Sequence, residues 1–229
     1  MPPATLSPTA LPARQRRKEA RPQELLEAAL ALFVEKGFAA TRSEEVALRA
    51  GVSKGTLYLY YPSKEELLKA VVRQNLSQLI AHGQVTAQSF DGPTPDLLAQ
   101  LMRTWWERVG SAPAGGIYKV MVAESCNFPE VARFFHQEVV LPGRQLIASL
   151  LQRGMARGEF REVPLAETTQ ALVAPLVFMA LQKHSFDACR AGAPVGPDPL
   201  RVLDTHIDLM LRGLAAVPPP SPPRRKPNR

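Results

Sequence analysis

The sequence predicts an all-α protein, with an N-terminal three-helix helix-turn-helix domain followed by a larger helical domain. Apolar residues recur at helical spacing along most of the chain, and no segment shows the alternation of a strand. Short helical patterns near the N-terminus are separated by glycine and proline stops. With 229 residues, of which 45% are apolar, the chain can form two modest domains.

The first helix is expected to begin at Pro22, because a proline in the first helical turn loses no backbone hydrogen bond. A stripe of leucines and alanines at helical spacing continues it to Phe33. Gly37 is expected to end the helix in the left-handed conformation, with Phe38 folding back onto Phe33.

A second helix is expected from about Arg42. Thr41 and Glu44 have the spacing of a capping box, in which the Thr hydroxyl would satisfy a free amide of the first turn. Gly51 and Val52 mark a tight turn after this helix.

A third, short helix is predicted over residues 54–61, with Ser53 as its N-cap. Leu57 and Tyr61 lie four residues apart and would share its inner face. Its outward lysine, threonine and tyrosines suit contacts to phosphates and base edges. Residues 42–61 therefore have the layout of a helix-turn-helix, whose second helix enters the major groove.

Pro62 is expected to stop the short helix, and Ser63 with Glu66 forms a second capping box. A fourth helix with a clear apolar stripe follows. The N-terminal domain is therefore expected to span residues 21–81.

The segment GVSKGTLYLYYPSKEELL resembles the signature of the tetracycline repressor (TetR) family of bacterial transcription regulators. The resemblance covers roughly residues 21–81, and beyond them it extends only to the helical layout. It implies a homodimeric DNA-binding regulator, most often a repressor that a small molecule releases from its operator.

The resemblance also implies which residues meet DNA. Arg42 and Ser43 would contact phosphate or a base edge, Gly55 would permit close approach, and Lys64 would meet phosphate. Leu59 and Tyr60 depart from the aromatic–histidine pair that is common in the family at these positions. The other matching DNA-facing positions are Lys54, Thr56 and Tyr58.

The net charge of +7 is unevenly distributed. Residues 1–75 carry 12 basic against 8 acidic side chains, and the tail from residue 224 adds four basic ones. A basic cluster from Arg14 to Lys18 lies in residues 1–20, which we expect to be irregular. This cluster fits either a solvated leader or an arm that reaches the DNA backbone or minor groove.

The sequence carries no signature of an enzyme, a cofactor site or a metal site. The four histidines are scattered, and Cys126 and Cys189 are expected to be reduced thiols of a cytoplasmic protein. No secretory signal is visible, and the longest apolar run is too short to span a bilayer. These absences predict no membrane partner and no cofactor, and the resemblance implies a bacterial, nucleoid-associated protein.

The helical domain is expected over residues 82–215, with Pro142-Gly143 kinking one helix and a helix opening at Pro164. A last helix should run over residues 200–214. Residues 216–229 are basic and proline-rich, which predicts a disordered tail.

Large apolar side chains on several helices of this domain fit either an ordinary core or an effector cavity. The resemblance favours a cavity for a largely apolar small molecule, with His136, Glu124 or Arg133 as polar anchors. The cavity candidates are Trp105, Trp106, Tyr118, Met121, Phe134, Phe135, His136 and Phe178.

The last two helices are apolar over most of their surface, which fits either burial in one chain or a dimer interface. In TetR-like proteins these helices pair across a two-fold axis. The interface candidates are Leu172, Leu176, Ala180, Leu203, Ile207, Met210, Leu211 and Leu214.

The sequence thus predicts an operator-binding transcription regulator that responds to a small molecule. The alternative is a helical ligand-binding or protein-interaction module of the same fold that does not bind an operator. Such a module would lack the lysine and tyrosines of the short helix, which this sequence retains.

Overall fold

The computed structural model describes residues 13–189 and 196–216, and its regular elements there are helices apart from one isolated β-bridge. The prediction of an all-α fold is confirmed. The α-helices are α1 (Ala13–Lys36), α2 (Ser43–Arg49), α3 (Lys54–Tyr60), α4 (Lys64–Val72), α5 (Gln78–Ser89), α6 (Thr94–Trp105), α7 (Gly116–Glu124), α8 (Pro129–Phe135), α9 (Leu141–Ala156), α10 (Leu165–His184) and α11 (Pro199–Leu214). Shorter turns are the π-helical η1 (Arg73–Ser77), η2 (Trp106–Gly110) and η4 (His136–Val140) and the 3-10 helices η3 (Pro113–Gly115) and η5 (Asp187–Cys189).

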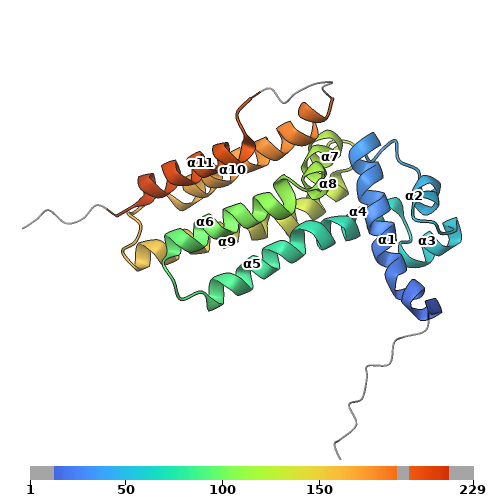
Figure 1. The fold of residues 1–229 in the computed structure, drawn as a ribbon, viewed down its shortest axis with the longest axis horizontal. Helices are drawn as coiled ribbons and strands as arrows, with labels where there is room; N and C mark the ends of the chain where they lie inside the picture. The colour runs from blue at the N-terminus through green and yellow to red at the C-terminus, as the bar shows by residue number, and fades with distance from the viewer. Residues whose placement is uncertain (1–12, 190–195, 217–229) are drawn as a thin grey trace, which may run out of the picture.

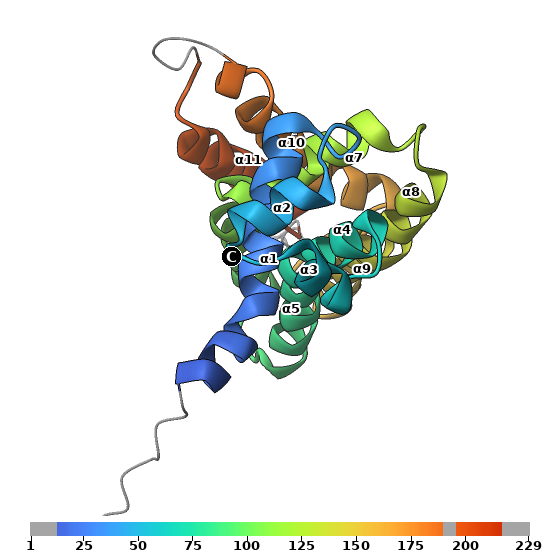
Figure 2. The ribbon, with the colours of Figure 1, turned by 90° about the vertical axis from the view of Figure 1, so that its right-hand side faces the viewer.

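The molecule is elongated, with α1, α2 and α3 at one end and a bundle of long helices extending away from them (Figure 1). Helices α5, α6, α9, α10 and α11 run along the long axis of this bundle. Seen from the end, α1, α2 and α3 face the viewer in front of the bundle (Figure 2). We call α1 to α4 the N-terminal head and the remaining helices the bundle.

Helix α1 begins at Ala13, so the prediction that it starts at Pro22 is wrong. Residues 13–21 are mainly alanine, arginine, lysine, glutamine and glutamate, which are strong helix formers. Their propensity outweighs the one hydrogen bond that Pro22 removes inside the helix. The expectation of an irregular arm is therefore wrong for residues 13–20, while residues 1–12 and the predicted tail from residue 217 lie outside the described residues.

The turn between α1 and α2 corrects a second prediction. Thr41 is buried and its hydroxyl donates to the carbonyl of Gly37 at 2.7 Å, so it satisfies a carbonyl at the C-terminus of α1 and does not cap α2. The amide of Arg42 instead donates to the carboxylate of Glu45 at 3.1 Å, which begins α2 at Ser43. A free carbonyl of one helix and a free amide of the next both need partners here, and neighbouring side chains supply them.

The other predicted turns and caps of the head are confirmed. Gly37 and Gly51 have φ angles of +86° and +66°, which favour glycine over residues with a Cβ atom. The hydroxyl of Ser53 accepts from the amide of Thr56 at 3.1 Å, and that of Ser63 accepts from the amide of Glu66. These caps fix where α3 and α4 begin.

The long helices of the bundle contain π-helical turns. The chain continues without a break from α4 through η1 into α5, so the proposed domain boundary at residue 81 lies inside a helix. Pro142 lies in the first turn of α9, directly after η4. Because Pro142 has no amide to offer, the wider π-turn accommodates it where a kink or break was expected.

The buried side chains form two clusters, and the first of them crosses the division into head and bundle. The first cluster joins the head to α7 and α8 and includes Phe33, Phe38, Leu57 and Ile117. The second joins α6, α9, α10 and α11. The head therefore shares its apolar core with α7 and α8.

Candidate nucleic-acid interface and ligand cavity

Helix α3 has one face in the core and another in solvent. Leu57 is fully buried, whereas Leu59 is 80% exposed and Tyr58 is 39% exposed. Lys54 and Gly55 are exposed on the same helix. The structure therefore brings four of the predicted DNA-facing residues together on one open surface.

Two further predicted residues of α3 are only partly accessible. The hydroxyl of Thr56 lies 2.9 Å from the hydroxyl of Ser53, beside the cap of the helix. Tyr60 is half-buried and packs against the apolar core of the head. Both lie at the edge of the open surface and not at its centre.

The start of α2 adds an arginine to this surface but not a serine. Arg42 is exposed, whereas Ser43 is only 7% exposed, so the side chain of Ser43 does not lie on the open surface where it was expected. Ser43 lies three and four residues before Val46 and Ala47, which face the core, and this spacing turns its side chain inward.

A carboxylate to which the sequence analysis assigned only a capping role lies on the same surface. Glu44 pairs with Lys54 at 2.5 Å, and both side chains are 55% exposed. The hydrogen bond from Lys54 lowers the pKa of Glu44. An exposed pair of this kind contributes little stability, so Lys54 remains available to exchange Glu44 for a phosphate.

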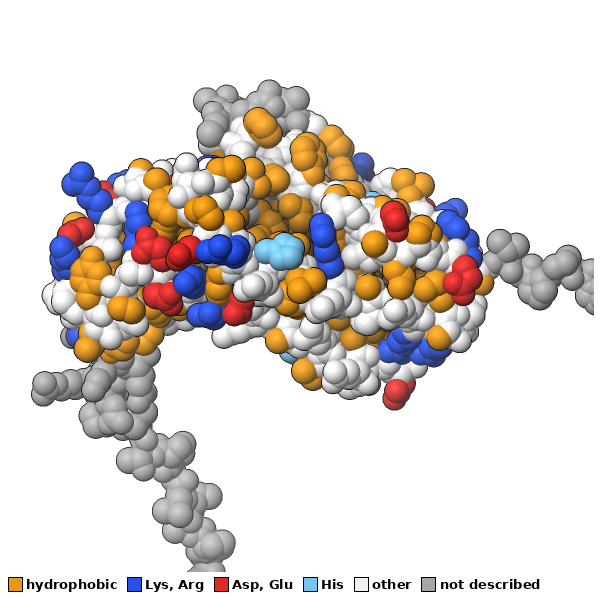
Figure 3. Space-filling model, turned by 180° about the vertical axis from the view of Figure 1, so that it is seen from behind, with side chains coloured by type: hydrophobic (Ala, Val, Ile, Leu, Met, Phe, Trp, Pro, Cys, Tyr) orange, Lys and Arg blue, Asp and Glu red, His pale blue; other side chains and the backbone are white. Residues whose placement is uncertain are grey.

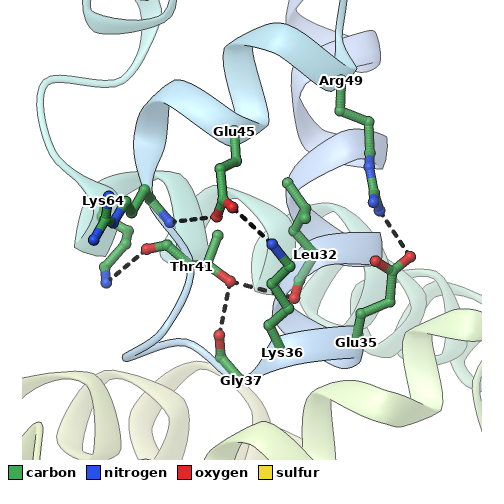
Figure 4. Close-up of polar contacts among 9 residues, drawn as sticks. Leu32, Glu35, Lys36, Gly37, Thr41, Glu45, Arg49 and Lys64 are labelled. Carbon is green, nitrogen blue, oxygen red and sulfur yellow. Dashed lines mark hydrogen bonds and ion pairs between the residues drawn. The ribbon is translucent and has the colours of Figure 1, made fainter.

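Two ion pairs join α2 to α1, Lys36–Glu45 and Arg49–Glu35, each at 2.7 Å (Figure 4). Both pairs are partly exposed, so they add little stability. The buried Val46 and Ala47 hold α2 against the core, and the far end of α2 leads into α3.

Lys64 does not point to solvent. Its ammonium donates to the carbonyl of Thr41 at 3.0 Å (Figure 4). It also donates to the carbonyls of Phe38 and Ala39 at 2.8 and 3.1 Å, and it lies 4.5 Å from the centre of the Phe38 ring. An ammonium has three donors, and these three carbonyls use all of them. The prediction that Lys64 meets phosphate is therefore wrong for this structure, where it holds the α1–α2 turn.

The bundle contains a cavity of about 460 Å³ among α5, α6, α7, η4, α9 and α10. On the face seen in Figure 3, hydrophobic side chains gather in a hollow bordered by basic and histidine side chains. The cavity wall is mainly apolar and contains no carboxylate among the described residues. Polar side chains on the wall are His82, Thr104, Tyr118, Arg144 and Gln170.

The polar groups of the cavity wall differ in setting. Arg144 and His82 are exposed, and Arg144 donates to the side chain of Gln170 at 2.6 Å. Tyr118 is half-accessible because it opens onto the cavity. Burial raises the pKa of Tyr118 to about 12, so its phenol stays neutral and can donate a hydrogen bond.

Half of the predicted cavity residues lie on this wall, namely Trp105, Tyr118, Phe135 and Phe178. Trp106 and Met121 belong to the two packed cores. Phe134 lies under Arg73, 4.8 Å from its guanidinium. The suggested anchors His136, Glu124 and Arg133 do not line the cavity, and no sequence signal distinguished them from Arg144 or Gln170.

The predicted interface residues of α10 and α11 are mostly buried inside the chain. Six of them are at most 5% exposed, and Met210 and Leu211 are half-buried against the same core. Large apolar side chains that these helices do expose include Phe178 and Leu209, at 61% and 64%. Six of the predicted interface residues therefore pack inside the chain, because helical spacing alone did not tell which face packs inward, and the placement of Met210 and Leu211 at the interface stays a prediction.

Helix α10 is long and apolar enough to span a bilayer by length and composition, with 22% of the relevant stretch buried. One such helix is weak evidence, because the core helix of a bundle meets the same criterion. Leu172, Leu176 and Ala180 of α10 pack inside the chain.

Two family models match this chain. The model described as bacterial regulatory proteins of the tetR family matches residues 25–71. The model described as a tetracyclin repressor-like C-terminal domain matches residues 92–191. Head and bundle therefore match models of the same kind.

Among similar proteins, the HTH-type transcriptional repressor KstR2 of Rhodococcus jostii is 28% identical over 202 residues, which cover 87% of this chain and 93% of that repressor. The HTH-type transcriptional regulator RutR of Escherichia coli is 47% identical over 68 residues, which cover 30% of this chain and 32% of RutR. The structure of FadR from Bacillus subtilis in complex with stearoyl-CoA has a TM-score of 0.65 at 16% identity, covering 84% of this chain and 98% of FadR.

Proposed function

Because this chain belongs to the TetR family of bacterial transcription regulators, we propose that it is a homodimeric repressor controlled through its cavity. The head binds operator DNA, and a small molecule in the bundle releases it. The protein acts in the cytoplasm on the nucleoid DNA.

The exposed face of α3 is the observation that carries this proposal. Tyr58 and Leu59 are apolar or amphipathic side chains that a short surface helix does not need for folding. Next to them, Lys54 and Arg42 supply positive charge. Such a surface suits the major groove, where Leu59 meets a thymine methyl and Arg42 meets a phosphate.

The cavity wall restricts the chemistry of the effector. Most of the wall is apolar, so the body of the effector is a hydrocarbon chain or ring system. Arg144 is the only residue on the wall with a permanent charge, and no carboxylate of the described residues is available there to balance a cationic ligand. We therefore assign to the cavity an apolar molecule with an anionic end group, as opposed to an amine.

The likeness to FadR supports this choice of effector. The FadR structure is described in complex with stearoyl-CoA, which combines an acyl chain with an anionic head. At 16% identity the likeness establishes a shared fold, so the assignment for this chain rests on its own wall residues.

We assign the dimer interface to the exposed sides of α10 and α11. Phe178 of α10 and Leu209 of α11 are large apolar side chains that are more than half exposed in one chain, and Phe178 also borders the cavity. A second copy placed against these helices by a two-fold axis would cover exposed apolar side chains in a self-complementary contact. The dimer then presents two α3 helices to successive turns of DNA.

Sequencing of genomic fragments that bind the purified protein tests operator binding. We expect a few enriched sites with two-fold symmetric sequence. Random genomic enrichment would favour the alternative, a module of the same fold without operator binding.

The effector class is tested by calorimetry with straight-chain carboxylates, alcohols and amines from octyl to hexadecyl. We expect the carboxylates to bind most tightly, and Arg144→Ala to remove that preference.

A further inference from the structure

The six residues that join α1 to α2 are held from two sides. Lys64 of the head binds three of their carbonyls. From the bundle side, the carboxylate of Glu124 accepts a hydrogen bond from the amide of Ala39 at 2.9 Å. Residues 37–42, which we call the joint, therefore contact both regions of the molecule.

A single peptide group connects the two charged side chains. The carbonyl of Phe38 and the amide of Ala39 belong to the same peptide unit. Lys64 donates to this carbonyl at 2.8 Å, and Glu124 accepts from this amide at 2.9 Å. A positive and a negative charge at opposite ends polarise the peptide, so each hydrogen bond strengthens the other.

Glu124 is poorly exposed and lies at the C-terminal end of α7. Glu124 is 8% exposed, and its second carboxylate oxygen accepts a hydrogen bond from the side-chain amide of Asn127 at 3.3 Å. Nearby, the ring of Phe128 contacts the ring of Phe38 edge-on, with 4.8 Å between centroids. A buried carboxylate that loses its donor is costly, so the hydrogen bond from Ala39 stabilises the arrangement of the joint seen in the structure.

The opposite end of α7 is fixed to α1. A Cβ atom on Gly116 would lie 2.5 Å from a methyl group of Val34, so the two backbones approach more closely than any other residue would allow. Lys119 also donates to the carbonyl of Val34 at 3.3 Å. Helix α7 therefore has a fixed N-terminal end, and its C-terminal end moves most when the helix tilts.

Between these ends, Tyr118 of α7 lines the cavity. Its ring packs edge-on against Trp105 and Phe135, with centroids 5.8 and 5.7 Å away. An effector that fills the cavity beside α7 would contact this ring. The backbone of α7 connects Tyr118 to Glu124, so a shift of α7 on ligand binding would move Glu124 relative to the joint.

We propose that Glu124 is the positioning residue that couples the cavity to the head, through the Phe38–Ala39 peptide and Lys64. With the cavity empty, the joint is closed and holds α2 and α3 in the orientation that binds DNA. With the cavity filled, Glu124 releases Ala39, and the head leaves that orientation. This inference rests on the proposed function and adds the route by which the cavity regulates DNA binding.

The test measures operator affinity by fluorescence anisotropy for effector-free Glu124→Ala, Glu124→Gln and Glu130→Ala. Glu130 is an exposed carboxylate six residues away, so its replacement controls for the removal of a charge. We expect Glu124→Ala to bind operator about tenfold more weakly, the factor expected for one buried hydrogen bond to a charged group. Glu124→Gln keeps an oxygen that can accept from Ala39 and should retain most of the affinity, and Glu130→Ala should match the wild type.

Hydrogen exchange on the same variants separates coupling from a general decrease in stability. We expect Glu124→Ala to speed amide exchange in the joint and α2, and to leave α9 and α10 unchanged. Wild-type affinity in Glu124→Ala, equally weakened binding in the Gln and Ala variants, or faster exchange throughout the chain would each overturn the proposal. If Glu124→Ala does not fold, Glu124→Asp, whose carboxylate is one methylene shorter, serves in the same comparison.

The DNA affinity of the wild-type protein distinguishes a failure of this proposal from a failure of the proposed function on which it rests. If wild type binds no specific DNA, operator binding itself is refuted. If wild type binds and Glu124→Ala binds equally well, operator binding stands and the coupling role of Glu124 is refuted.

Discussion

The head and the bundle differ in how much polar contacts add to apolar packing. In the head, α2 and α3 have seven residues each and bury only Val46, Ala47 and Leu57 among their apolar side chains, and caps and the ammonium of Lys64 add to this packing. In the bundle, the long helices α5, α6, α9, α10 and α11 have 12 to 20 residues and pack through apolar side chains around a cavity of about 460 Å³. Directional polar contacts give the head one defined arrangement. The cavity leaves some side chains of the bundle without packing partners, so the bundle can adjust when a ligand enters.

This difference matches the two tasks of the protein. A DNA-reading surface needs fixed side chains, because base contacts depend on geometry. A regulatory domain needs a region where a small molecule can shift the balance between two arrangements. Helix α7 belongs to both, since its buried residues join the core of the head while Tyr118 lines the cavity.

The largest expected effect comes from separating the two subunits. Leu209→Asp places a charge on the exposed face of α11 and should give a folded monomer by light scattering and circular dichroism. Its operator affinity should fall about a thousandfold or more, toward the non-specific level. The buried neighbour Ile207 is 3% exposed, and Ile207→Asp should instead unfold the bundle. A dimeric Leu209→Asp variant with normal operator affinity would refute the proposed interface.

The next largest effects are expected from substitutions on the two faces of α3, which should change either stability or operator affinity. Leu57→Ala should reduce the free energy of unfolding by about 2–5 kcal/mol, because the side chain is fully buried. Leu59→Ala should change the stability by less than about 0.5 kcal/mol while weakening operator binding. Chemical denaturation and anisotropy on both variants make the comparison. If Leu59→Ala proves the less stable of the two, the assignment of the faces is wrong.

A smaller effect concerns the salt dependence of operator binding, which should differ between variants of Arg42 and Lys64. Arg42→Ala should flatten the slope of log K against log salt by about 0.9 for each phosphate that the arginine neutralises in the wild type. Lys64→Met should weaken binding through the joint and leave the slope unchanged, since its donors are used within the protein. A flatter slope in Lys64→Met would restore Lys64 as a residue that meets phosphate directly.

The smallest effect is a pH dependence of stability in the bundle. Burial lowers the pKa of His184 below its ordinary value of 6.5, and the ring lies 3.2 Å from the carbonyl of Gly110. The unfolded chain then binds a proton more readily than the folded one, so stability should fall as the pH drops below about 6.5. Thermal unfolding of His184→Gln should lose part of this dependence, and a variant of the exposed His136 serves as control. An unchanged pH profile in His184→Gln would contradict this account.

The head could be predicted well because its signals are local. Gly37, Gly51, Ser53 and Ser63 each act on residues within one turn, and the structure places them as the sequence predicted. Predictions failed where a distant group decides the outcome. Lys64 was expected at DNA, but the carbonyls that it binds lie 23 to 26 positions earlier in the chain.

The bundle was harder to predict because apolar spacing does not tell an inner face from an outer one. Leu172 and Leu203 were expected at the dimer interface but are 1% exposed within one chain. Trp105 and Trp106 are adjacent, yet one lines the cavity and the other belongs to a packed core. These outcomes depend on how several helices pack together, which no single segment specifies.

The central claim is that occupancy of the cavity controls operator binding, and one titration tests it most directly. Operator binding is followed by anisotropy while the carboxylate that binds best in calorimetry is added, with the matching amine as control. We expect operator to be released over the concentration range in which the carboxylate binds, and Arg144→Ala to need more carboxylate for the same release. A carboxylate that saturates the cavity and leaves operator affinity unchanged would contradict the claim.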